Sequence, residues 1–306
     1  MVDGIIKITK PKLILCGQDL PCPDTTIPVV DADRLREMRD LPPAPFHWGD
    51  PNRPAYIVFT SGTSGTPRAV VHAHRAIMAR QMMMRDWYDL HEEDRLCHAG
   101  AFNWTYTMGT GLMDPWTMGA TALIPGPGID PSQLPLLLKR HDATLIAAAP
   151  GVFRKLLGLG TPLSLPKLRH GFSAGEKLSE TIRNTWRDRT GTELYEAYGM
   201  SECSTFISAA PSRPAPASAL GFAQTGRRLA ILGPYGPVPI GEEGTIAVHL
   251  TDPGLMLEYL GAQDAMAERM QGEWFLTGDQ ASMAEDGAIS FLGRYDDMMN
   301  AGGYRV

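Results

Sequence analysis

Early in the chain, a cluster of hydroxyl side chains and glycines has the composition of a phosphate-binding loop. Residues Thr60–Thr66 read TSGTSGT. Gly62 and Gly65 allow a tight turn, and small hydroxyls with exposed backbone N–H groups can surround an anion. The apolar run Tyr56–Phe59 before the loop is typical of a buried strand, and the segment after it favours a helix. A plain solvated loop is the alternative, and the common P-loop pattern ending in Lys-Ser/Thr is absent.

The composition limits which classes of protein fit the chain. Its 306 residues are 43% hydrophobic and 20% charged, with a net charge of -6, so a full core can form and no basic surface for nucleic acid is indicated. Cys16, Cys22, Cys97 and Cys203 lack paired metal spacing, which favours free thiols in the cytoplasm. The longest apolar stretches are too short to span a membrane.

The segments that must position the loop alternate between strand and helix patterns. After the loop, residues 74–90 carry apolar pairs four apart, Met78/Met82 and Met83/Trp87, which predict a helix with the methionines in the core. Short apolar strands are expected at residues 120–124, 144–149, 168–173 and 192–197. This alternation indicates an α/β fold with a parallel sheet flanked by helices, whose strand ends hold ligand sites.

The two ends of the chain follow other patterns. Residues 1–50 contain one short strand and a proline-rich connection. After residue 210, short strands with frequent turns predict a small antiparallel, barrel-like sheet.

Three separated stretches resemble the adenylate-forming (ANL) superfamily, the AMP-dependent synthetases and ligases that include acyl-CoA synthetases. They are the loop FTSGTSGTPRAV, the segment ELYEAYGMSECS at Glu193–Ser204, and the segment Trp274–Val306 with its Thr-Gly-Asp and Gly-Arg-x-Asp elements. The resemblance implies an N-terminal strand and linker at 1–50, a nucleotide- and acyl-binding lobe at 51–210, a small β subdomain at 211–292 and a hinge at 293–306.

The resemblance also implies a reaction. A carboxylic acid would be activated by ATP to an acyl-adenylate, with Mg²⁺ as cofactor, and the acyl group would pass to CoA. The ATP phosphates would be bound by Thr60, Ser61, Gly62, Thr63, Ser64, Gly65 and Arg68. Adenine and ribose would be bound by Ala174, Gly175, Glu176, Tyr198, Asp279 and Arg294. Ser201 and Glu202 would be catalytic, Glu202 would hold the metal, and Asp296 would be the hinge.

The acyl substrate is expected to be an aryl or short- to medium-chain carboxylate. The resemblance places its pocket at Phe102, Trp104, Ala149, Gly171 and Gly199. For the two aromatic residues an ordinary core position is the open alternative.

The chain departs from the family pattern in several places. Thr66 and Arg68 stand where lysine is usual, Ala69 where glycine is usual, and Ser201 where threonine is usual. The sequence stops after the hinge, so the resemblance implies a fragment lacking the C-terminal lid and its lysine. A non-catalytic nucleotide- or acyl-binding paralogue or scaffold is the alternative, and a luciferase-like or peptide-synthetase activity is a third. Apolar edges exposed by the truncation would favour self-association into a homo-oligomer.

Overall fold

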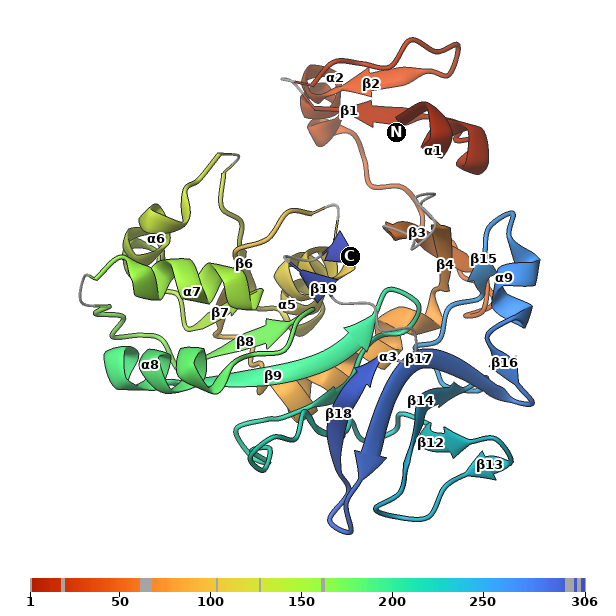
Figure 1. Ribbon diagram of the computed structural model, residues 1–306. Helices are drawn as coiled ribbons and strands as arrows, with labels where there is room; N and C mark the ends of the chain where they lie inside the picture. Colours follow the sequence, from red (N-terminus) through yellow and green to blue (C-terminus); the bar gives the residue numbers. More distant parts are fainter. Residues whose placement is uncertain are drawn as a thin grey trace.

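The structure is a computed structural model that describes residues 2–17, 20–60, 68–102, 104–126, 128–160, 163–294, 300–301 and 304–305 (Figure 1). Most strands belong to one large mixed sheet with the order β13-β12-β14-β17-β18-β11-β10-β9-β8-β7-β5-β6. Two-stranded and three-stranded sheets lie outside it.

One half of the large sheet is parallel, as the alternating pattern predicts. Its strands are β6 (Thr121–Leu123), β5 (Arg95–His98), β7 (Leu145–Ala148), β8 (His170–Ala174) and β9 (Glu193–Met200). Helical segments α3 (Arg75–Met83), η2 (Met84–Tyr88), α4 (Thr105–Met108), η3 (Gly109–Met113) and α5 (Asp114–Met118) follow β4 and β5. The others in this half are η4 (Pro131–Gln133), α6 (Leu134–Arg140), α7 (Pro150–Gly158) and α8 (Glu180–Thr190).

Alternating residues of β7 show why helices cover both faces of this half. Leu145 and Ala147 join the cluster built with α3, η2 and α4, whereas Ile146 and Ala148 join the cluster built with α6, α7 and α8. Because successive side chains of a strand point to opposite faces, a wholly apolar strand must be buried on both. The expected α/β class is confirmed.

The other half of the sheet is antiparallel and continues directly from β9. Its strands are β10 (Ser204–Ser208), β11 (Gly221–Ala223), β18 (Ala288–Arg294), β17 (Trp274–Met283), β14 (Glu243–His249), β12 (Leu229–Gly233) and β13 (Gly236–Pro237), and β16 (Met270–Gln271) pairs with β17. The antiparallel strands expected after residue 210 therefore form, and they share one hydrogen-bonded sheet with the parallel strands.

The expectation of a helix directly after the phosphate loop is wrong. Arg68–Ala73 form strand β4, which pairs antiparallel with β3 (Pro54–Thr60) and with β15 (Glu258–Tyr259). Ala69–Ala73 are buried, so tertiary packing outweighs the helix-forming composition of this segment. In β3 only Val58 is buried, because this strand lies at the edge of the three-stranded sheet.

The predicted helix after β4 begins at Arg75 and passes into a π-helical turn at Met84. Met83 and Trp87 are fully buried, which confirms a core position for that pair. Met78 is 60% exposed, so the expectation that it belongs to the core is wrong.

The first forty residues contain more structure than the proline-rich pattern indicates. The expected strand is β1 (Ile14–Cys16), which pairs parallel with β2 (Val29–Asp31). Helices α1 (Val2–Thr9), α2 (Ala32–Glu37) and η1 (Met38–Asp40) complete a unit that Figure 1 shows standing apart from the large sheet. Asp31 caps α2 by accepting a hydrogen bond from Arg34 N.

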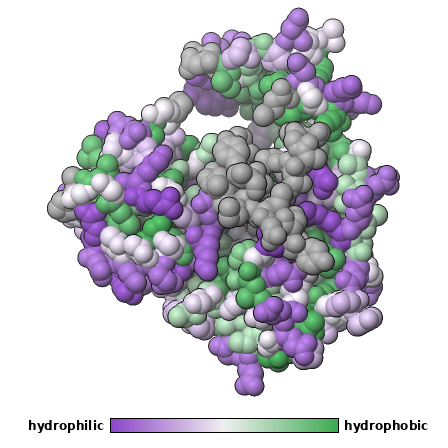
Figure 2. All heavy atoms as spheres, viewed as in Figure 1, coloured by the Kyte–Doolittle hydropathy of each residue, from purple (hydrophilic) through white to green (hydrophobic). Residues whose placement is uncertain are grey.

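Short elements complete the description: α9 (Gln263–Ala267), β19 (Asn300–Ala301) and β20 (Tyr304–Arg305). The helices of the described residues include none that is long and apolar enough to cross a membrane. Cys16, Cys22, Cys97 and Cys203 are free thiols in this structure. Figure 2 shows hydrophilic and hydrophobic residues interspersed over the visible face. Phe46, Trp48 and Trp116 are well exposed, while self-association stays a prediction.

Candidate active site

The turn that joins β9 to β10 is the centre of the candidate site. It contains Ser201 and Glu202 and is tightly packed against the neighbouring backbone. A Cβ atom on Gly199 would lie 2.2 Å from the carbonyl oxygen of Ser204, so only glycine fits there. Ser204 itself has a φ of 60°, a left-handed conformation that few side chains adopt. This strained turn sets the position of the two residues expected to be catalytic.

His72 holds this turn against strand β4. Its Nε2 lies 2.7 Å from the carbonyl oxygen of Ser201, and its ring stacks on Tyr56 with 4.8 Å between centroids. Burial lowers the pKa of His72 to about 4, so the ring is neutral near pH 7 and Nε2–H donates to Ser201. His72 was not predicted as a site residue, because its role depends on the unpredicted strand β4 and on a contact with a residue 129 positions away.

Glu202 points into a buried polar cluster that contains Tyr259 and lies near Arg68. Its Oε1 accepts a 2.6 Å hydrogen bond from the hydroxyl of Tyr259 and lies 4.0 Å from Nη1 of Arg269. The guanidinium of Arg68 lies over the Tyr259 ring, 5.3 Å from its centroid. Thr60 and Arg68 face each other across β3 and β4. Arg68 and its strand partner Thr60, which flank the predicted phosphate loop in the sequence, are thus on the same side as Glu202.

The residues of this cluster fit a magnesium ion bound together with nucleotide phosphates. Oε2 of Glu202 has no hydrogen-bond partner among the described residues. Within the described ranges, no group of three or more His, Cys, Asp or Glu side chains could hold a metal. Mg²⁺ commonly takes one or two carboxylates and completes its shell with phosphate oxygens and water, which matches one available carboxylate oxygen.

The residues expected to bind ribose and adenine are brought together from distant strands. Nη1 of Arg294 donates to Oδ1 of Asp279 at 3.0 Å, across the paired strands β17 and β18. The hydroxyl of Tyr198 donates to Oδ2 of the same carboxylate. Burial and the Asp279 charge raise the pKa of Tyr198 well above its ordinary value, which keeps the phenol protonated as a donor.

Residues Ala174–Glu176 lie next to this cluster, at the carboxyl end of the neighbouring parallel strand. Ala174 of β8 pairs with Ala197 of β9, immediately before Tyr198. Gly175 then turns the chain with a φ of 93°. The expected adenine-binding backbone and the expected adenine-facing tyrosine therefore lie close together, at the carboxyl ends of two neighbouring parallel strands.

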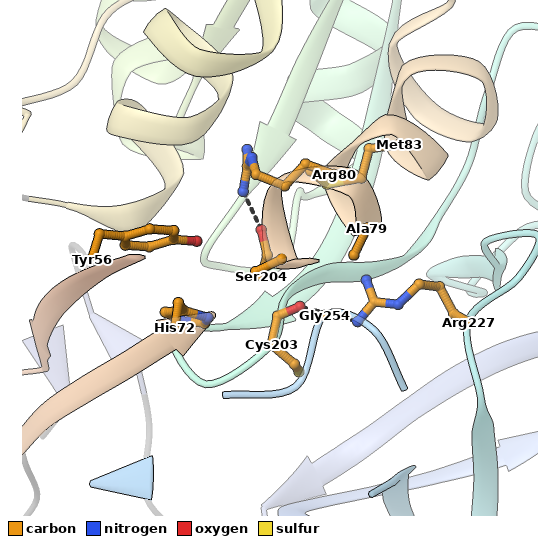
Figure 3. Close-up of a pocket in the computed structure, with 10 residues that line it drawn as sticks. Tyr56, His72, Ala79, Arg80, Met83, Cys203, Ser204, Arg227 and Gly254 are labelled. Atoms are coloured by element: carbon orange, nitrogen blue, oxygen red, sulfur yellow. Dashed lines mark hydrogen bonds between the residues drawn. The ribbon is translucent and has the colours of Figure 1, made fainter. Parts of the chain in front are cut away.

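A pocket open to solvent lies beside this strand end. Of the predicted residues it is lined by Trp104, Ala174, Gly175, Gly199 and Ser201. Arg80 and Ser204, which the sequence analysis missed, also line it. Figure 3 shows Arg80 reaching from α3 to Ser204, in the narrow adjoining pocket that His72 and Tyr56 also line.

Three residues expected in the acyl pocket are not among the described residues that line it: Phe102, Ala149 and Gly171. A Cβ atom on Gly171 would lie 2.6 Å from Leu194 Cδ2, within the apolar cluster on the opposite face of the sheet. Successive residues of a strand face opposite sides of the sheet, and the sequence pattern did not show which side Gly171 faces. In the structure it faces away from the pocket.

Several predicted residues lie outside the described residues. They are Ser61, Gly62, Thr63, Ser64 and Gly65 of the loop and Asp296 of the hinge. Their roles stay predictions.

Comparison with known proteins identifies the family. The family model described as AMP-binding enzyme matches residues 5–260. The chain belongs to this family, which confirms its resemblance to adenylate-forming enzymes.

Curated relatives include two mitochondrial acyl-coenzyme A synthetases. ACSM1 of Mus musculus is 35% identical over 263 residues, and ACSM5 of Homo sapiens is 32% identical over 260 residues. Each match covers 83% of this chain and 45% of the relative. The chain therefore spans less than half the length of these relatives.

Solved structures share the fold over nearly the whole chain. A malonyl-CoA ligase, in a ternary product complex with methylmalonyl-CoA and AMP, has a TM-score of 0.85 at 25% identity, covering 98% of this chain and 65% of that one. The anthranilate CoA ligase AuaEII, in complex with anthranoyl-AMP, has a TM-score of 0.84 at 24% identity, covering 100% of this chain and 62% of that one.

Proposed function

We propose that this chain supplies the nucleotide- and acyl-binding part of an ATP-dependent carboxylate–CoA ligase. One observation carries the proposal: residues of the single short segment Tyr198–Glu202 take part in three different groups of the candidate site. Gly199 and Ser201 line the open pocket, and Tyr198 hydrogen-bonds to the ribose candidate Asp279. Glu202 accepts a hydrogen bond from Tyr259, whose ring lies under the guanidinium of Arg68. One strand end therefore adjoins the expected positions of acid, ribose and phosphates.

The arrangement suits a reaction that joins two anions. Attack of a carboxylate on the α-phosphate of ATP requires both reactants to be aligned and the charge on the leaving pyrophosphate to be neutralised. Arg68 would place positive charge at the phosphates, and the hydroxyl of Ser201 would orient the acid. Glu202 would hold Mg²⁺, which neutralises phosphate charge when bound. Asp279 would accept hydrogen bonds from the ribose hydroxyls.

The relatives support the choice of CoA as acceptor and of ATP as the activating nucleotide. The names of the two synthetases and of both ligases specify CoA, and the two ligase structures contain AMP or an acyl-adenylate. We extend CoA as acceptor and ATP as activating nucleotide to this chain on that basis.

The test measures binding and chemistry separately on the 306-residue protein. Calorimetric titration should show Mg²⁺-dependent ATP binding, and labelled pyrophosphate should exchange into ATP only when a carboxylic acid is present. Benzoate, a short-chain acid and a medium-chain acid form the panel. ATP binding without exchange for any acid would contradict ligase activity of this chain, and failure to bind ATP would contradict the whole proposal.

A matched pair of variants tests the metal role. Glu202→Gln removes the charge beside Tyr259 and should abolish the Mg²⁺-dependent part of ATP affinity. Glu193→Gln makes the same change at the start of β9, where the carboxylate is 42% exposed and lies 3.8 Å from Nη1 of Arg187, and should leave that dependence intact. Equal behaviour of the two variants would refute the assignment.

A further inference from the structure

A cluster of hydrogen-bonded polar side chains centred on Arg80 lies at the pocket that Ser201 also lines. We call this cluster the polar floor; its other members are Asp114, Ser204, Tyr88 and Thr110. Arg80 is 3% exposed and makes a two-pronged ion pair with Asp114, with Nε to Oδ1 and Nη2 to Oδ2 both at 2.7 Å. Nη1 donates to Oγ of Ser204 (Figure 3). A Cβ atom on Gly109 would lie 2.1 Å from Nη2, so the glycine makes room for the guanidinium.

Two π-helical turns position this floor. Tyr88 closes η2, Thr110 lies in η3, and Asp114 directly follows η3. Oη of Tyr88 lies 2.6 Å from Oγ1 of Thr110 and 2.9 Å from Oδ2 of Asp114. Such turns are rare and recur at functional sites.

A count of hydrogens shows what this floor offers a ligand. The guanidinium has five N–H groups, and three are used within the described residues, which leaves one on each terminal nitrogen. Ser204 Oγ accepts from Arg80, so its own hydrogen is available. Tyr88 has one hydrogen and gives it to Asp114, so Thr110 donates to Tyr88 and keeps an acceptor lone pair.

The charge of the polar floor and its position in the pocket limit further the class of ligand that it could bind. Asp114 neutralises Arg80 in a bidentate pair, so the floor offers directed hydrogen bonds and no net positive charge for a second anion. Arg80, Thr110 and Ser204 line the same pocket as Ser201, with Trp104 as an apolar wall. An uncharged hydroxyl is the smallest substituent whose single oxygen can both accept from Arg80 or Ser204 and donate to Thr110.

We propose that the acid bound in this pocket carries a hydroxyl group at the end remote from its carboxylate. The inference rests on the proposed function, which places the carboxylate near Ser201, and adds the substrate class. A purely apolar acid would bury the donors of Arg80 and Ser204 and the acceptor of Thr110 without giving them hydrogen-bond partners. Leaving such groups unpaired costs free energy, and a site built this way therefore binds acids without a hydroxyl more weakly.

The test compares acids that differ by one group in direct calorimetric titrations without ATP. The pairs are 4-hydroxybenzoate with 4-methylbenzoate, and 5-hydroxypentanoate with hexanoate. At least one hydroxy acid should bind about tenfold or more tightly than its methyl partner, the size of one well-formed hydrogen bond. Terephthalate, which carries a second carboxylate, should bind more weakly than 4-hydroxybenzoate.

Two variants remove hydroxyls while keeping the buried ion pair. Thr110→Val is nearly isosteric, and Ser204→Gly suits the φ of 60° at that position. Each should reduce the hydroxy-to-methyl preference to about threefold or less. Thr121→Val, an equal change on the exposed edge strand β6, should keep the full preference.

The outcomes separate this inference from the proposed function. Tighter binding of both methyl acids, tighter binding of terephthalate, or no binding of any acid would overturn the inference even if ATP binds. A hydroxy-acid preference in a protein that fails to bind ATP would support the inference about the pocket and overturn the nucleotide proposal alone.

Discussion

The hydroxyl of Tyr198 lies 2.5 Å from Oδ2 of Asp279, although β10, β11 and β18 separate their strands in the order of the large sheet. A flat sheet would keep β9 and β17 far apart, because neighbouring strands are about 4.8 Å apart. The sheet therefore curls, and its curvature brings the parallel half and the antiparallel half together at one site.

Replacing Tyr198 by Phe tests whether this hydrogen bond orients Asp279 toward a ribose. Loss of one neutral donor to a carboxylate should weaken ATP binding about fivefold, equivalent to about 1 kcal/mol. Calorimetric titration with ATP measures the change. With 2′,3′-dideoxy-ATP the variant and the wild type should bind alike, and an equal loss with that analogue would show that Tyr198 acts elsewhere on the nucleotide.

Replacing His72 by Gln tests the buried imidazole as a source of pH dependence. The folded-state pKa of about 4 is below the ordinary 6.5, so the stability from the neutral ring is complete above pH 6.5 and is lost as the pH falls toward 4. Between pH 6 and pH 4.5 the free energy of unfolding should fall by about 1 kcal/mol per pH unit on this account. Urea unfolding of the wild type and His72→Gln at pH 7, 6 and 5 measures it.

The pH dependence of stability must be compared between the wild type and His72→Gln, because other buried groups also titrate in this pH range. Burial lowers the pKa of His98 to about 3, in the same direction, whereas burial raises the pKa of Glu196 to about 7, which removes stability as the pH rises from 4.5. Both are present in each protein. The Gln side chain can still donate a hydrogen bond to Ser201, so the two proteins should differ only in how steeply the free energy of unfolding changes with pH. Identical slopes would rule out His72 as a source of this pH dependence.

Gly199→Ala should destabilise the fold by about 2 kcal/mol or more, because the added Cβ meets backbone that cannot rotate away. That atom would lie 2.2 Å from Ser204 O and 2.5 Å from Thr205 Cα. Chemical denaturation measures the loss. Gly151→Ala in α7, where a Cβ meets nothing within 4 Å, should cost nothing, and equal losses would contradict the packing argument.

Arg227→Met should cost about 3–5 kcal/mol, because it leaves the carboxylate of Asp252 buried without its ion partner. The two side chains are 1% and 0% exposed, with Nη2 and Oδ1 2.9 Å apart. Guanidinium denaturation measures the effect. In the exposed pair Arg34–Glu37, Arg34→Ala should change stability by less than about 1 kcal/mol. A small loss at Arg227 would mean that water or other groups solvate Asp252.

Local patterns of the sequence were enough to predict four of the five parallel strands, all except β5, and the signals that mark α8 are equally local. The helix contains Ile182 and Trp186 four residues apart, and both are buried. Ser179 caps its start by accepting from Ile182 N, and Gly191 ends it with a φ of 72°. Periodicity and capping depend on residues within one turn of each other, so they can be read without the fold.

The sequence by itself determined the family, the strand–helix alternation and the residue types of the candidate site, because motifs and periodicities are local. Only the tertiary structure decided that Arg68–Ala73 are a strand, that His72 anchors Ser201 across 129 residues, and that Arg80 enters the pocket. Such contacts depend on how the sheet curls and which face each strand residue takes. A one-residue shift in alternation moves a side chain to the opposite face, as at Gly171, and no local pattern reports that choice.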